Sequence, residues 1–314
     1  MTMISFSDRF IRASLSVIGF PLSLFQFASS RSQASQYKPT GQLIEIDQQT
    51  VHVDVSGQGS PTIILESGMG GCSLDWCYVQ PKLAEIATVI SYDRAGFGWS
   101  TPSHSEPTCQ KYVNDLRVLL TTLGRKPPFL LVGHSYGGMI MRLFAATYPD
   151  EVMGLVLVDS THENRYLQER SNPTRKKQRL HHLKMHRLGY LLSPIAIPRL
   201  LRMSIGSKRL PPEILNHARA VGYRTSAYKS AYLELLHAHE SAIQLQHAQP
   251  LRHDLPVIVL SAGKQPDEWQ QGQKDLVHLT ELTQQIIVED SWHSIQIHKP
   301  DVVINSVKGL LNMT

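Results

Sequence analysis

The chain of 314 residues carries 31 Lys and Arg against 26 Asp and Glu, and 42% of its residues are hydrophobic. That hydrophobic fraction excludes a disordered chain, and the length suffices for one large domain or two small ones, each with a core of its own. Three cysteines cannot form the disulfide framework of a small secreted fold. We expect Cys72 and Cys77 to be free thiols rather than a bridged pair.

The first 36 residues differ in composition from the rest of the chain. Between Ala13 and Ser30 there is no charged residue, and Leu, Ile, Phe and Val are frequent. This stretch is short for a spanning helix, but it fits an interfacial anchor, a signal-peptide hydrophobic region or a soluble arm. We expect residues 1–36 to form an anchor or signal segment that ends in a polar linker over 29–36. This favours a membrane-associated or exported protein over a cytoplasmic one.

The globular pattern begins near Gly41 with two alternating segments that predict an antiparallel pair of strands. Short apolar runs then alternate with helical patterns, which predicts an α/β fold with a mostly parallel sheet covered by helices on both faces. The predicted strands are Gln42–Asp47, Thr50–Val55, Thr62–Leu65, Thr88–Tyr92, Phe129–Val132, Gly154–Val158, Val257–Leu260 and Ile286–Val288. The predicted helices are Val79–Ile86, Cys109–Leu123, Tyr136–Tyr148, Glu213–Ala220, Ala227–Gln246, Asp275–Gln285 and Asp301–Leu311.

A Gly-x-Ser-x-Gly motif, with Ser135 at its centre, lies between the predicted strand Phe129–Val132 and the helix that starts near Tyr136. A sharp turn from strand to helix would expose the hydroxyl of Ser135 in a strained conformation. The helix N-terminus and the backbone N–H of Tyr136 could then stabilise negative charge on a bound acyl oxygen. The motif therefore indicates a nucleophile.

With this motif the chain resembles the α/β-hydrolase fold superfamily of serine esterases and lipases. The resemblance rests on four segments: Glu66–Gly71, Tyr92–Ser100, Gly133–Gly138 and Leu155–Ser160. It covers about residues 41–159 and resumes from 255 to the C-terminus. These segments are specific for the fold and say little about the substrate.

The resemblance implies a base and an acid for Ser135, in the chain order Ser, acid, His. His293, which follows the last predicted strand, is the expected base, and His298 is its competitor. The expected acid is Asp267, in the loop after Val257–Leu260. Asp159 is the alternative because some members place the acid after the preceding strand, and Glu268 is a third candidate.

The resemblance also places a second oxyanion donor in the loop after Thr62–Leu65. The backbone N–H of Met69 is the candidate there, with that of Tyr136 as the first donor. Glu66 is expected to brace this loop, where many relatives carry a His-Gly pair. Asp93 and Arg94 are expected to brace the fold rather than to react.

Residues 161–252 contain 16 Lys and Arg against 5 Asp and Glu, so the basic excess of the chain lies in this segment. By resemblance it is a helical lid inserted into a core formed by residues 37–160 and 253–314. The cationic run over 175–187 suggests a lid that docks on anionic lipid or steers an anionic substrate, unless it is simply a solvated helical face. His181, His182 and His186 lack the carboxylates of a metal site, and the run lacks the aromatic residues of a nucleic-acid site.

Together these features predict a hydrolase that cleaves an ester-type acyl bond through an acyl-enzyme, with no metal or cofactor. We expect a small, apolar acyl substrate and membrane contact through residues 13–30 and the lid. Acyl transfer, thioester hydrolysis, carbon–carbon bond hydrolysis and a non-catalytic binding role remain alternatives. The resemblance disfavours haloalkane dehalogenases and epoxide hydrolases, which use an Asp nucleophile where this chain has Ser135.

Overall fold

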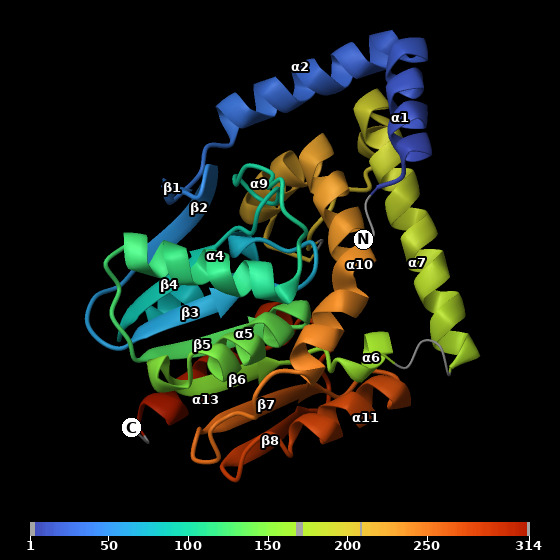
Figure 1. Cartoon of the computed structure of the whole chain (residues 1–314). Coiled ribbons are helices and arrows are strands. Elements are labelled where there is room, and N and C mark those ends of the chain that lie inside the picture. Colours follow the sequence, from blue (N-terminus) through green and yellow to red (C-terminus); the bar gives the residue numbers. More distant parts are fainter. Residues whose placement is uncertain (1–3, 168–171, 208, 313–314) are drawn as a thin grey trace.

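The computed structural model describes residues 4–167, 172–207 and 209–312. Its centre is an eight-stranded sheet in the order β1-β2-β4-β3-β5-β6-β7-β8 (Figure 1). β2 runs antiparallel to β1 and β4, and the other neighbours are parallel. The strands are β1 Gln42–Ile46, β2 Gln49–Ser56, β3 Thr62–Glu66, β4 Thr88–Tyr92, β5 Phe129–His134, β6 Val152–Val158, β7 Val257–Ala262 and β8 Thr283–Val288. The expected α/β architecture is confirmed.

The central strands are buried on both faces, which explains their continuous apolar sequences. Successive side chains point to opposite faces, so Leu131 and Leu155 join one core while Leu130 and Val156 join the other. α4 and α5 cover the first face, and α3 and α13 cover the second. The core helices and turns are η1 Ser73–Trp76, α3 Gln80–Leu83, α4 Cys109–Thr122, α5 Tyr136–Thr147, η2 Pro149–Glu151, α11 Asp267–Leu276, α12 Ile295–His298 and α13 Pro300–Leu311. Cys72 and Cys77 are free thiols, as expected.

Between β6 and β7 the chain leaves the sheet and forms a group of helices beside the ends of these strands (Figure 1). The long helix α10 contacts α7 and α6 within this group, and α4 and α5 of the core. The cationic run lies in α7. The elements are α6 Asn164–Leu167, α7 Pro173–Leu192, η4 Ser193–Ile195, α8 Ile197–Leu200, α9 Pro212–Gly222 and α10 Thr225–Gln246. We call residues 161–252 the insert.

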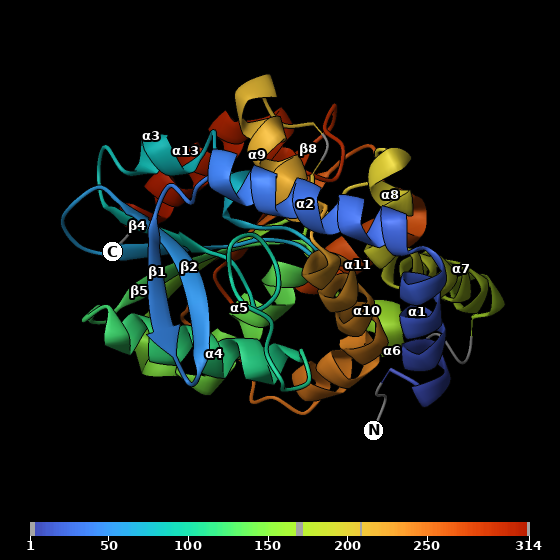
Figure 2. The ribbon, with the colours of Figure 1, turned by 90° about the horizontal axis from the view of Figure 1, so that it is seen from above.

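The N-terminal segment folds into two helices, α1 (Phe6–Ile18) and α2 (Phe20–Gln36). α1 lies beside α7, and α2 contacts η4 and α9, so both helices pack on the insert (Figures 1 and 2). The expected polar linker over 29–36 is wrong, because that stretch is the last part of α2. Within the described residues no single helix is long and apolar enough to cross a bilayer, and only the pair α1 and α2, bent by 94°, meets those criteria together.

One predicted helix, Asp275–Gln285, is also wrong. The helix in this region, α11, begins at Asp267 and ends at Leu276, and Thr283–Val288 is the edge strand β8. Pro266 precedes α11, and two carboxylates occupy its first turn, which stabilises a helix N-terminus. β8 pairs with β7 on one side only, so it is half exposed and lacks the continuous apolar sequence of the central strands.

Candidate active site

Ser135 occupies the sharp turn between β5 and α5. Its backbone has φ 52° and ψ −119°, a conformation that a non-glycine residue rarely adopts. The flanking glycines make this turn sterically feasible. A β-carbon at Gly133 would lie 2.7 Å from the carbonyl oxygen of Gly137, and one at Gly137 would lie 2.6 Å from that of Glu66. Glycine is therefore required at both positions, because the backbone approaches closely on each side of the serine.

Three side chains from distant parts of the sequence form one hydrogen-bonded chain. His293 Nε2 lies 2.9 Å from Ser135 Oγ, and His293 Nδ1 lies 2.7 Å from Asp159 Oδ2. An imidazole held in this way by a carboxylate keeps its proton on Nδ1 and presents the free electron pair of Nε2 to the hydroxyl. The arrangement can thus remove a proton from Ser135 as the hydroxyl attacks an electrophile.

Asp159 is fully buried at the end of β6, with a positive φ of 42°. Besides His293, three donors hold its carboxylate: Ala262 N at 3.0 Å, Trp269 Nε1 at 3.0 Å and Gln265 Nε2 at 3.2 Å. A buried carboxylate with this many donors is held in one orientation and compensated for its lost hydration.

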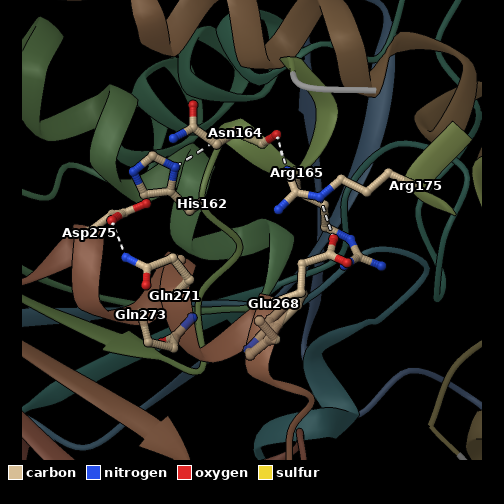
Figure 3. Close-up of a pocket in the computed structure, with 10 residues that line it drawn as sticks. His162, Asn164, Arg165, Arg175, Glu268, Gln271, Gln273 and Asp275 are labelled. Atoms are coloured by element: carbon tan, nitrogen blue, oxygen red, sulfur yellow. Dashed lines mark hydrogen bonds and ion pairs between the residues drawn. The ribbon is translucent and has the colours of Figure 1, made fainter. Parts of the chain in front are cut away.

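The expectation that Asp267 orients the imidazole is wrong in geometry. Asp267 is exposed as the first residue of α11, and Glu268 pairs with Arg175 of α7 (Figure 3). Because β6 and β7 are parallel neighbours, their C-terminal ends meet at one edge of the sheet, and a carboxylate after either strand could lie near His293. The structure pairs the imidazole with Asp159, which was the alternative.

The loop Glu66–Gly71 lies directly over the serine. A β-carbon at Gly68 would be 3.2 Å from Ser135 Cβ. The N–H of Met69 makes no hydrogen bond within the described residues, and Tyr136, as the first residue of α5, has an N–H that no carbonyl of the helix accepts. Both backbone donors therefore remain candidates for binding an oxyanion, as expected from the sequence.

A buried ionic network fixes this loop from behind. Arg94 pairs with Glu66 and with Glu234 of α10, and it donates hydrogen bonds to the carbonyl oxygens of Ser67 (2.7 Å) and Gly68 (2.8 Å). Glu234 also accepts from the Gly70 N–H at 3.0 Å. This supports the bracing role expected for Glu66 and Arg94, and it shows that the insert supplies one of the bracing groups.

Asp93, the other residue expected to brace the fold, pairs with His52 rather than with Arg94. Asp93 Oδ2 lies 2.8 Å from His52 Nδ1, and both side chains are fully buried. The carboxylate also accepts from the backbone N–H groups of Ser73 and Trp99 at 2.7 and 2.9 Å. Asp93 therefore joins β2 to the loops after β3 and β4.

Two aromatic residues beside His293 were not found from the sequence. His134 lies with its ring centre 4.8 Å from that of His293, and its Nε2 donates to the His293 carbonyl oxygen at 3.2 Å. Burial, and then the proximity of the His293 ring, lower the pKa of His134 well below its usual value. The Trp269 ring meets that of His293 edge to face at 4.9 Å. His134 could have been noticed in the sequence because it stands inside the serine motif, whereas no local pattern distinguishes Trp269.

A group of residues that could hold a metal ion lies apart from this site. Ligand atoms of Glu106, His237 and Glu240 lie within 4.8 Å of one another, and His237 Nδ1 is 3.1 Å from a Glu240 oxygen. None of the three contacts Ser135 or His293 in the described part of the chain. We assign this group no part in the chemistry of the serine.

The sequence and structure match known proteins over most of the chain. A model of the alpha/beta hydrolase fold family matches residues 61–300, and the protein belongs to this family. The uncharacterized protein YqjL of Bacillus subtilis is 26% identical over 255 residues, which cover 79% of this chain and 82% of YqjL.

Two solved structures show the same fold. The epoxide hydrolase CorEH superimposes with a TM-score of 0.69 at 21% identity, over 87% of this chain and 98% of that one. A thermophilic esterase from Thermogutta terrifontis gives 0.59 at 19% identity, over 86% and 96%. Members of the family with different chemistry thus share this architecture, and the choice among them depends on the site.

Proposed function

We propose that this protein is a serine hydrolase that cleaves an ester-type acyl bond through an acyl-enzyme. The observation that supports it is the hydrogen-bonded chain Ser135–His293–Asp159 at a strained turn. His293 takes the proton of Ser135 as its oxygen attacks the carbonyl carbon of the substrate. The N–H groups of Met69 and Tyr136 stabilise the resulting oxyanion, and each such donor lowers the barrier by roughly 3–4 kcal/mol.

The second half of the cycle uses the same groups. His293 returns the proton to the leaving alcohol, which departs as the ester bond breaks and leaves the acyl group on Ser135. A water molecule then gives a proton to His293 and attacks the acyl carbon, which releases the acid and restores the serine. Asp159 stabilises the imidazolium formed in each half.

The identity of the nucleophile separates this proposal from epoxide hydrolysis and dehalogenation. Those reactions, in enzymes of this fold, proceed through an alkyl ester on an aspartate, which Ser135 cannot form. A hydroxyl activated by a histidine instead suits attack on a carbonyl carbon.

An apolar groove beside the loop supports an acyl chain as part of the substrate. It encloses about 340 Å³ between α7, α8 and α10, and its walls include Leu188, Leu201 and Met203. Ile205, another of its lining residues, would lie 3.4 Å from a β-carbon at Gly70. The groove therefore leads to the loop that covers Ser135, and we assign it to the acyl chain.

Replacement of Ser135 by Ala tests the reaction. The unmodified protein should hydrolyse 4-nitrophenyl butyrate and should be labelled by a fluorophosphonate at Ser135, and the Ser135→Ala variant should do neither while its melting temperature is maintained. A folded protein that neither turns over esters nor reacts with the fluorophosphonate would instead be a non-catalytic binding protein.

A second proposal concerns the N-terminal helices, which expose large apolar side chains. Phe6, Phe10 and Val17 recur on one side of α1 and are 84%, 65% and 76% exposed, and Phe27 of α2 is 63% exposed. Apolar side chains on a helix packed against a protein ordinarily face that protein. Here they face outward, which leaves large apolar side chains exposed on both helices.

Polar side chains attach the opposite faces to the insert. Asp8, only 4% exposed, pairs with Arg187 of α7 through hydrogen bonds of 2.6 to 3.1 Å. Gln26 donates to the Tyr223 carbonyl oxygen at 2.8 Å and accepts from Arg199 at 2.8 Å. These hydrogen bonds hold the inner side of each helix on the insert, and the apolar residues are thereby kept on the outer side.

We infer that this outer surface lies on an anionic membrane. Asp8 is the only carboxylate before Glu45, and it faces inward, whereas Arg9 and Arg31 are exposed. Apolar side chains with flanking cations and no outward anion match the interface of an anionic bilayer. Each helix thus has a polar side that faces the insert and an apolar side that faces outward, which suits a helix pair that lies in the membrane plane.

Vesicle sedimentation of the full chain tests this proposal. We expect the protein to bind vesicles of phosphatidylcholine with phosphatidylglycerol more strongly than phosphatidylcholine alone, and Phe10→Ser with Phe27→Ser to weaken binding. Leu43→Ser, on the edge strand β1, is a matched exposed control that should not change it. A dimer in solution that dissociates in the Phe double variant, with no vesicle binding, would show that a second copy covers this surface.

A further inference from the structure

A small cavity with a cationic lining lies beside the loop over Ser135. It encloses about 120 Å³ beneath α7, and Met69 itself forms part of its wall. No carboxylate is among the described residues that line it. Its basic lining residues are Arg165, Arg175, Arg179, His182 and His186, and the phenol of Tyr166 also lines it.

Two arginines of the cavity are held in place by contacts with the core. Arg175 pairs with Glu268 and donates to the Asn164 carbonyl oxygen at 2.9 Å (Figure 3). The guanidinium of Arg165 lies 5.2 Å from the centre of the Trp269 ring, which in turn contacts His293. Arg165 is therefore separated from the catalytic imidazole by a single aromatic ring.

The cavity also adjoins the apolar groove. His186 lines both, and the two spaces reach neighbouring residues of one loop, Met69 in the cavity and Gly70 beside the end of the groove. Burial, and then the charge of Arg165, lower the pKa of His182, which agrees with a positive potential in this space. An apolar space and a cationic one thus both adjoin the loop that carries Met69, the candidate oxyanion donor.

We propose that this cavity binds a carboxylate of the substrate, so that the ester attacked by Ser135 is an anionic one. This rests on the proposed serine-hydrolase function and adds its substrate class: esters that carry a free carboxylate, such as monoesters of dicarboxylic acids. The planar guanidinium matches a carboxylate in two parallel hydrogen bonds, and the partly enclosed site strengthens the attraction. The small volume suits a carboxylate better than a large anionic headgroup.

Paired substrates test this inference. Mono-4-nitrophenyl esters of dicarboxylic acids of increasing length are compared with 4-nitrophenyl esters of monocarboxylic acids of the same carbon number. The measured quantity is the ratio of kcat/KM for the anionic ester to that for the neutral one. We expect a ratio of roughly ten or more at one chain length, since a single charge-assisted contact is worth about that factor.

Variants locate the source of the preference. Arg165→Gln should lower the ratio by roughly tenfold. Lys177→Gln removes the same charge from an exposed position of α7 outside the cavity and should leave the ratio unchanged. A ratio that falls equally in both variants would overturn the cavity assignment in favour of a general effect of positive charge.

The outcomes separate this inference from the proposed function. Hydrolysis of neutral esters with a ratio near one at every length overturns the carboxylate site and leaves the serine hydrolase intact. If no ester is hydrolysed and no fluorophosphonate reacts, the hydrolase proposal fails. The carboxylate site in the cavity can then still be tested by measuring ligand binding. In that case monomethyl glutarate should bind the Ser135→Ala protein roughly tenfold more tightly than methyl pentanoate, and Arg165→Gln should remove the difference.

Discussion

His293 lies 2.7 Å from Asp159, a carboxylate at the end of β6, and not beside Asp267 in the segment after β7. The two aspartates are 108 positions apart in the numbering, yet both follow strands that are neighbours in the sheet. One is buried among four donors and the other is exposed at a helix start. This difference leads directly to a test of the proposed triad.

Asp159→Asn should lower kcat for 4-nitrophenyl butyrate by roughly 10³- to 10⁴-fold, because the amide cannot stabilise the imidazolium and favours the wrong tautomer. Asp267→Asn, the matched control, should stay within about twofold, as expected of an exposed surface position. Steady-state kinetics with both folded variants decide the matter; a large loss in Asp267→Asn with an active Asp159→Asn protein would reverse the assignment.

Trp269→Phe should reduce kcat by roughly ten- to a hundredfold with little change in KM, because a hydrogen bond to a charged group contributes about 1.5–3 kcal/mol. The change removes the indole donor to Asp159 and keeps an aromatic ring against His293. Trp99→Phe loses a comparable indole hydrogen bond, to the Tyr37 carbonyl oxygen at 3.0 Å, which involves no side chain of the triad. Equal kinetics for the two variants would mean that Trp269 does not position the carboxylate.

Arg94→Met should destabilise the fold by about 3–5 kcal/mol, because it leaves Glu66 and Glu234 buried without their cation. The loop over Ser135 should lose its support, so kcat should also fall. Urea denaturation measures the stability, with Lys82→Met as the control, since the Lys82–Glu85 pair is exposed and should contribute little. A stable Arg94→Met protein would contradict the bracing role.

Asp75 predicts a pH dependence of stability. Burial raises its pKa from the usual 3.8 to about 6, so the folded state binds the proton more tightly than the unfolded state does. The stability that this group contributes is therefore present at low pH and is lost as the pH rises through about 6. The free energy of unfolding of the unmodified protein, relative to Asp75→Asn, should fall by roughly 2 kcal/mol between about pH 4.5 and 7.5. Parallel urea titrations of both proteins give this difference, and identical pH profiles would contradict it.

The position of the nucleophile could be predicted from the sequence because it depends on local sterics. Gly133 and Gly137 permit the turn at Ser135, and the apolar run before it and the helix after it are visible within twenty residues. His293 could be proposed only through the resemblance, which places the base in the loop after the last strand. The resemblance to the alpha/beta hydrolases then supplied the order of the partners.

Elements with weak local signals could not be predicted in the same way. The spacing of Leu276, Leu279 and Leu282 resembles that of a helix, although α11 ends at Leu276 and β8 begins at Thr283. Pairing with β7 decides the strand, and no pattern within β8 itself reveals that partner.

The sequence by itself determined the α/β class, the serine turn and the apolar composition of the N-terminal segment, because each depends on the pattern of neighbouring residues. Only the tertiary structure decided which aspartate meets His293, that Trp269 and Glu234 support the site, and that the apolar side chains of α1 and α2 face outward. These depend on which strand ends and helix faces come together, and contacts between residues more than a hundred positions apart leave no local trace in the chain.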